Sequence, residues 1–161
     1  MKIELWHMNP GPGANSEELA KVLLARFGLL PRKVDAKAQF HRLLLELYER
    51  KKHSLKERKP ELAVMSVDQM AAYAGIARQT FYEYMARWLT LQVIKKTSFV
   101  ADKRLTTGYE LNGNNLEAAF ARSKNIVEDH TQTSIEIAKG LQTEIKKEKL
   151  RAGKGDETLL S

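Results

Sequence analysis

The fold is decided by residues 70–89, which read MAAYAGIARQTFYEYMARWL. This stretch predicts two helices that meet at a tight turn, because Gly75 can adopt a left-handed conformation that costs other residues about 1 kcal/mol or more. Small Ala71 and Ala72 would let the two helices cross closely. The apolar positions at the turn and in the second helix recur with the spacing of one helical face. We expect a core to receive Ile76, Phe81, Met85 and Trp88.

The ends of both helices can also be predicted. Ser66 and Gln69 have the spacing of a capping box, in which each side chain satisfies a backbone N–H of the other residue. A short helix is therefore expected over Val67–Ala74, and a second one from about Arg78 to Leu91. The N-cap of the second helix is Ala77, which lacks a side-chain oxygen and so loses about 1 kcal/mol of capping.

The elements on either side of this stretch follow from their patterns. Residues 92–100 and 106–111 read as two strands joined by a charged turn at residues 101–105. Upstream, Ala63–Met65 reads as a short strand. Before it we expect a longer helix, capped by Asp35. Its apolar face would consist of Phe40, Leu43, Leu44, Leu47 and Tyr48.

Residues 70–89 resemble the helix-turn-helix of DNA-binding regulators, and residues 35–111 resemble a winged helix in the order of their elements. The resemblance implies that the second helix enters the major groove and that the hairpin forms a wing against the DNA backbone or minor groove. The expected fold is mainly α with a small β-hairpin wing, followed by a long C-terminal dimerisation helix.

The resemblance also implies a set of DNA-contacting residues. Arg78 would pair with guanine and Gln79 with adenine, although both would be ordinary surface residues outside this motif. Tyr82 either packs or touches a phosphate or a thymine methyl group. Lys95 and Lys96 straddle the two faces of a strand, so at most one of them is expected to touch DNA. The full set is Arg78, Gln79, Thr80, Tyr82, Glu83, Arg87, Lys95, Lys103 and Arg104, the last two at the wing tip.

The net charge of +7 is confined to the middle of the chain. Residues 32–112 hold sixteen Lys and Arg against nine Asp and Glu, whereas residues 1–31 and 113–161 are each neutral. Such a local excess indicates a polyanionic partner or a solvated basic surface. The basic run at residues 50–59 is a second backbone contact or a helix end that complements the macrodipole.

The C-terminal part of the chain predicts a helix from Leu116 to about residue 151. At 1.5 Å per residue it would be about 50 Å long, more than a domain of this size can cover. Its four-three apolar spacing is that of a coiled-coil seam, in which the polar His130 would fix the register. We expect homodimerisation through Leu116, Phe120, Val127, His130, Ile137, Leu141 and Ile145.

The N-terminal part predicts a short strand over residues 2–8 and a helix from the N-cap Asn15 to about Phe27, ended by Gly28. Its role is left open. The expected division is an N-terminal arm with a short helix at residues 1–31, a winged-helix domain at 32–112, a dimerisation helix at 113–151 and a disordered tail at 152–161.

Several classes of protein are not expected. The absence of cysteine excludes disulfide scaffolds, iron–sulfur sites and thiol catalysis. The four histidines are scattered, and neither a nucleophile motif nor a carboxylate pair stands out, so we expect no metal, no cofactor and no enzyme. No apolar run approaches the roughly 18 residues of a membrane span, and no signal peptide is visible. We expect a soluble, cytoplasmic and nucleoid-associated protein.

These observations predict a homodimer that binds specific double-stranded DNA sequences, as a transcriptional regulator does. One alternative keeps DNA binding but assigns plasmid or viral replication, partition or chromosome organisation, since replication-terminator-like proteins also dimerise through one C-terminal helix. Another alternative is a winged helix that binds protein, with Arg78 and Gln79 facing a protein partner. A small-molecule effector is left open.

Overall fold

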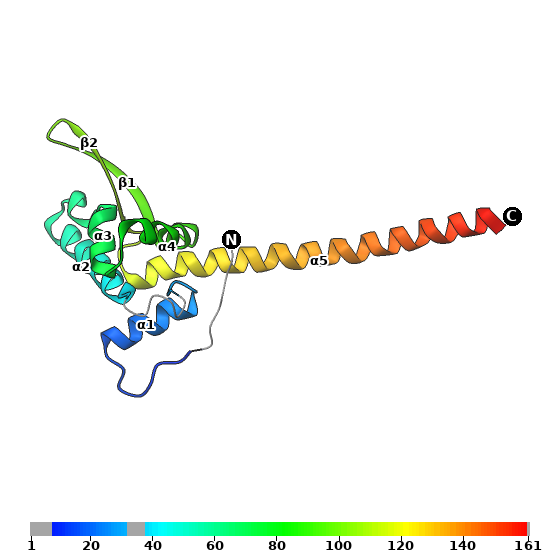
Figure 1. Cartoon of the computed structure of the whole chain (residues 1–161), viewed down its shortest axis with the longest axis horizontal. Helices are drawn as coiled ribbons and strands as arrows, with labels where there is room; N and C mark the ends of the chain where they lie inside the picture. The colour runs from blue at the N-terminus through cyan, green and yellow to red at the C-terminus, as the bar shows by residue number, and fades with distance from the viewer. Residues whose placement is uncertain (1–7, 32–37, 161) are drawn as a thin grey trace. The chain divides into compact units, whose positions relative to one another are not determined.

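The structure is a computed structural model that describes residues 8–31 and 38–160 (Figure 1). The strand expected over residues 2–8 and the expected cap Asp35 lie outside the described residues, apart from Met8. The chain divides into two units, residues 1–123 and residues 124–161, and each is considered by itself. The described part is mainly helical, with one two-stranded antiparallel sheet and a long C-terminal helix.

The first unit is built around helix α2. The helices are α1 (Ser16–Arg26), α2 (Phe40–Glu57), the 3-10 helix η2 (Pro60–Ala63), α3 (Val67–Ala74) and α4 (Arg78–Thr90). They are followed by the strands β1 (Ile94–Ala101) and β2 (Arg104–Leu111) and by helix α5 (Leu116–Leu160). Helix α2 packs against α1, η2, α3 and β2, and α3 packs against α4 (Figure 1).

Aromatic side chains form the centre of the core. The ring of Phe40 lies 6.2 Å from that of Phe81 and 6.1 Å from that of Trp88, measured between centroids. Both α4 residues are buried, as is Met85, which confirms the predicted inner face of this helix. Ile76 is only half-buried. The core position predicted for Ile76 is therefore only partly confirmed.

The helix ends confirm most of the predicted caps. Asn15 accepts a hydrogen bond from the backbone N–H of Glu18 at 2.9 Å. Ser66 and Gln69 form the reciprocal capping box, and Gly75 ends α3 in the left-handed conformation with φ 71°. Ala77 makes no side-chain capping bond, as expected.

Helix α2 begins later than predicted. Its N-cap is Gln39, not Asp35, and the first helical residue is Phe40. The backbone N–H of Gln39 donates to the carbonyl of Ala74 at 2.7 Å. This bond ties the chain to the end of α3 just before α2 starts, an interaction between segments that local capping patterns do not reveal.

The predicted strand at Ala63–Met65 is wrong. Pro60, at the start of η2, favours a helical turn, and the 3-10 helix continues to Ala63. Only Met65 makes a bridge, in which it exchanges two backbone hydrogen bonds of 2.8 Å with Tyr109. The neighbouring Gly108 permits this approach, because a Cβ atom there would lie 2.7 Å from the Met65 carbonyl oxygen.

The hairpin turn is tighter than predicted. Ala101 pairs with Arg104, so the turn consists of Asp102 and Lys103 rather than residues 101–105. Both turn residues have positive φ, 51° and 62°, which matches the twist that two-residue hairpin turns require. Arg104 is therefore the first residue of β2 and not part of the turn.

Helix α5 starts as predicted and ends later. Asn115 caps it by accepting a hydrogen bond from the Ala118 N–H at 2.8 Å. The first turns belong to the first unit, where Phe120 is buried and its ring lies 5.2 Å from that of Phe27. The helix continues to Leu160, so residues 152–160 are helical rather than disordered. The glycines in this stretch do not end the helix, because glycine weakens a helix by about 1 kcal/mol but, unlike proline, does not block it.

The second unit consists of the remainder of α5. The side chains from residue 128 to residue 154 are all exposed. Among the described residues, no helix combines the length and the apolar character that crossing a membrane requires.

Candidate nucleic-acid interface

The outer face of α4 carries the first group of candidate residues. Three residues, Gly75–Ala77, join α3 to α4. Because Phe81, Met85 and Trp88 are buried, the opposite side of the helix faces outward. Exposed on it are Arg78, Gln79, Tyr82 and Glu83. The backbone N–H groups of the first turn lack intrahelical partners, and Ala77 offers no side-chain acceptor, so this helix end can receive an anion.

Arg78 is held in place by its neighbours. Its Nε and Nη2 atoms lie 3.3 Å and 3.1 Å from the Tyr82 hydroxyl oxygen, and Nη1 lies 3.4 Å from Asp68. The hydrogen bond to Tyr82, together with the charge of Asp68, raises the pKa of Arg78 further above its ordinary value. The guanidinium thus has Tyr82 and Asp68 as partners and remains exposed.

Two of the predicted α4 residues do not join this outer face. Arg87 is half-buried, and its Nη1 donates to the Gly28 carbonyl oxygen at 3.4 Å, which ties α4 to the residues after α1. Thr80 is half-buried as well. Of the two alanines expected to let the helices cross closely, Ala71 is buried and Ala72 is exposed. Ala74 is buried as well.

The hairpin carries the second group of candidates, which divides into a tip and a base. Lys103 and Arg104 are exposed at the tip. Lys95 is exposed near the base, but its Nζ lies 3.4 Å from the Glu110 carboxylate. A contact between Lys95 and a phosphate would therefore compete with an existing ion pair.

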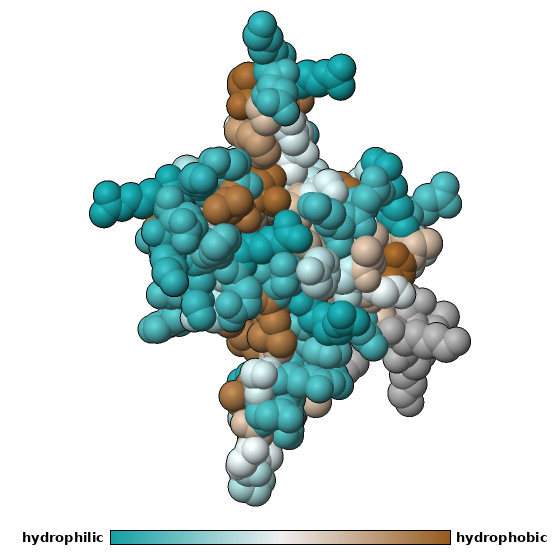
Figure 2. Space-filling model, turned by 90° about the vertical axis from the view of Figure 1, so that its left-hand side faces the viewer, coloured by the Kyte–Doolittle hydropathy of each residue, from teal (hydrophilic) through white to brown (hydrophobic). Residues whose placement is uncertain are grey.

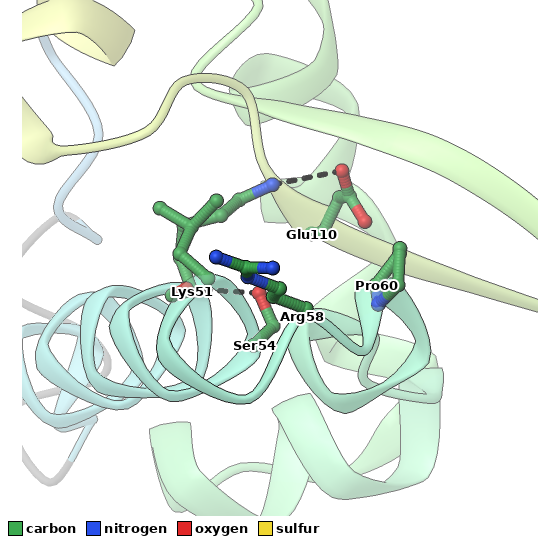
Figure 3. Close-up of a pocket in the computed structure, with 6 residues that line it drawn as sticks. Lys51, Ser54, Arg58, Pro60 and Glu110 are labelled. Atoms are coloured by element: carbon green, nitrogen blue, oxygen red, sulfur yellow. Dashed lines mark hydrogen bonds and ion pairs between the residues drawn. The ribbon is translucent and has the colours of Figure 1, made fainter.

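An ion pair lies beside a hollow at the base of the hairpin, and Figure 3 shows the residues that line the hollow. The hollow has a volume of about 350 Å³. The Nζ of Lys51 lies 2.9 Å from the Glu110 carboxylate, and both residues are buried. This pair joins α2 to β2 across 59 residues of sequence, and no local pattern predicts it. The hollow is lined by Lys51, Ser54, Leu55, Arg58, Pro60 and Glu110.

The basic run at residues 50–59 does not form one surface. Lys51 is buried, whereas Arg50 lies 2.8 Å from Glu46 and its guanidinium lies over the ring of Tyr73. Lys52 lies 3.6 Å from Glu49. Arg58 takes the left-handed conformation that ends α2. Several members of the run thus have intramolecular roles, which favours its structural interpretation.

The predicted dimerisation residues also divide into two groups. Phe120 is buried within its own chain, and Leu116 and Val127 are half-buried. The later positions are open, since the side chains of Ile137, Leu141 and Ile145 are 67%, 60% and 41% exposed. His130 is exposed too. Of the predicted seam, only the later part is therefore exposed.

Within residues 8–31 and 38–154, no three His, Asp or Glu side chains gather in a way that could hold a metal ion. Comparison with family models, curated proteins and solved structures finds no match.

Proposed function

We propose that this protein is a winged-helix protein that binds specific double-stranded DNA sequences as a homodimer and regulates transcription. The observation that carries the proposal is the two-sided character of α4. Its inner face is fixed by Phe81 and Trp88, and its outer face presents Arg78 and Gln79 in the first turn. A rigid helix whose N-terminal residues are polar and exposed suits insertion into the major groove.

In this proposal each outer residue has a chemical role. Arg78 donates two hydrogen bonds to guanine, after it exchanges its weak pairing with Asp68 for the base edge. Gln79 reads adenine through its amide. Tyr82 orients the guanidinium through its hydroxyl. The free backbone N–H groups of the first turn donate to a DNA phosphate, whose oxygens supply the capping that Ala77 lacks.

Two copies would pair through the exposed stripe of α5 around Ile137 and Leu141. A symmetric dimer places two copies of α4 on two half-sites, so the target should be palindromic. The hairpin cations Lys103 and Arg104 would contact the backbone on either side and add affinity without sequence preference.

The test begins with selection of a preferred duplex from a random pool. Arg78→Ala and Gln79→Ala should each weaken binding to that duplex by about 1–3 kcal/mol and binding to random duplex much less. Arg42→Ala is the matched control, because Arg42 is an exposed arginine on α2 whose side chain bonds Gln39. Equal losses on both duplexes, or a control that loses as much as Arg78→Ala, would show that α4 does not read bases.

Genome-wide occupancy separates regulation from the architectural alternative. Occupancy at a small number of promoters is the expected result for a regulator. Broad coverage would assign the same DNA binding to chromosome organisation or partition instead.

A further inference from the structure

The tip of the hairpin presents an uncovered aliphatic pair. Val100 and Leu105 are 74% and 73% exposed, the largest exposed fractions among the large apolar side chains that the structure describes. They are direct partners in the β1–β2 register, so their side chains project from the same face of the hairpin. Figure 2 shows apolar surface among hydrophilic surface at the top of the view, where the hairpin tip lies.

The same face changes in character towards the base. Ser98 and Thr107 form the next cross-strand pair on this face, and their hydroxyl groups are 3.1 Å apart. At the base, Ile94 and Leu111 are buried in the core. Between them and the Ser98–Thr107 pair lies the pair of Lys96 and Tyr109. The aliphatic pair at the tip is therefore separated from the core by two cross-strand pairs that carry polar groups, and no part of the hairpin's own packing accounts for it.

The charges around the tip indicate what covers it. Between residues 96 and 107 there are three cations, Lys96, Lys103 and Arg104, and one anion, Asp102. This excess of positive charge suits a polyanion that also offers an apolar surface for the pair. Duplex DNA has both properties, because phosphates line the minor groove and the faces of stacked bases lie behind it. Apolar side chains inserted from the minor groove partly unstack a base step and kink the duplex.

We propose that Val100 and Leu105 act as a wedge that enters the minor groove and kinks the DNA, while Lys103 and Arg104 hold the flanking phosphates. This inference rests on the proposed function, since it assumes that the first unit binds DNA. The wedge favours pyrimidine–purine steps at its point of entry, because these steps unstack most easily. The hairpin thereby adds sequence preference without any hydrogen bond to a base.

The experiment measures DNA bending by energy transfer between dyes at the two ends of the selected duplex. The test variant is Val100→Ser with Leu105→Ser. Leu19→Ser, at a 48% exposed position on α1, is the matched control. The serine variant should leave the duplex straight and bind it roughly tenfold more weakly, with an unchanged salt dependence. A duplex with a mismatch at the entry step should recover most of that loss, because unstacking it costs less.

A second variant separates the wedge from the charges. Lys103→Gln with Arg104→Gln should lower the salt slope by about two units per subunit, since each lost phosphate contact contributes about one. Leu105→Met, which keeps an apolar side chain, should still bend the duplex. The circular dichroism spectrum of each variant should match that of the wild type, because the altered side chains are exposed.

Equal bending by wild type and serine variant would overturn the wedge and leave the proposed function intact. Failure of the wild type to bind any duplex would overturn both. A serine variant that lowers the oligomeric state without DNA, or that abolishes binding to anionic phospholipid vesicles, would assign the pair to self-association or to a membrane surface and overturn the wedge.

Discussion

Helices α2 and α5 carry the same apolar spacing but differ in what covers it. In α2 the side chains of Phe40, Leu44 and Leu47 are fully buried by other elements of the same unit. In α5 the side chains of Ile137 and Leu141 are mostly exposed, although they recur at similar intervals. An amphipathic pattern thus does not by itself specify whether the elements of its own unit cover the apolar face.

The sharpest test of this comparison pairs Phe40→Ala with Leu141→Ala. Phe40→Ala should lower the free energy of unfolding by about 3–5 kcal/mol at every protein concentration, because its ring packs within its own unit. Leu141→Ala should act only through the dimer, so its effect should depend on concentration. Urea unfolding at several protein concentrations measures both. A concentration-independent loss in Leu141→Ala would contradict the role given to α5.

The buried charge on α2 gives a second, smaller effect. Lys51→Met should cost about 3 kcal/mol of unfolding free energy, since it leaves the buried Glu110 carboxylate with only Lys95 at 3.4 Å. The double variant Lys51→Met with Glu110→Leu should recover most of this loss, because no charge then remains unpaired. Lys52→Met is the control, because Lys52 is an exposed neighbour on the same helix. If the double variant is no more stable than the single one, the ion pair is not what Lys51 contributes.

The smallest predicted effect concerns His41, a buried histidine on α2. Burial is the main reason that the pKa of His41 falls below 6.5, and the neighbouring Lys21 lowers it further, although Glu17 at 3.4 Å opposes both. The unfolded chain then binds a proton more readily than the folded one, so stability is lost as pH falls through about 6.5.

Denaturant unfolding between pH 7.5 and pH 5.5 measures this dependence. The pKa of Glu17, which is lowered from 4.5 by the hydrogen bond from Lys21, lies below this window. His41→Gln should reduce the loss of stability towards acid, because it removes the group whose pKa burial lowers. A full acid-induced loss in His41→Gln would assign the dependence to other groups.

Local patterns in the sequence predicted the centre of the fold well. The capping box at Ser66 and Gln69, the turn glycine Gly75 and the buried face of α4 all depend on residues within one or two helical turns of each other. Such interactions can be recognised without knowing what packs nearby. The existence of the hairpin follows in the same way from its strand-forming residues.

The errors arise where distant segments meet. The N-cap Gln39 donates its backbone N–H to the Ala74 carbonyl oxygen, and the half-buried Arg87 donates to the Gly28 carbonyl oxygen. The pairing of Lys51 with Glu110 is equally remote in sequence. Of the candidate interface, the exposure of Arg78 and Gln79 could therefore be predicted, but the loss of Arg87 from it could not.

The close approach at Gly108 bears on how the hairpin can move. The bridge between Met65 and Tyr109 ties the base of β2 to the residues just before α3, and the Lys51–Glu110 pair ties the next residue to α2. Beyond these two attachments, residues 100–107 of the hairpin are exposed. A force applied at the tip would thus bend the outer part of the hairpin first. Any displacement of the base of β2 would pass through the bridge to the residues just before α3.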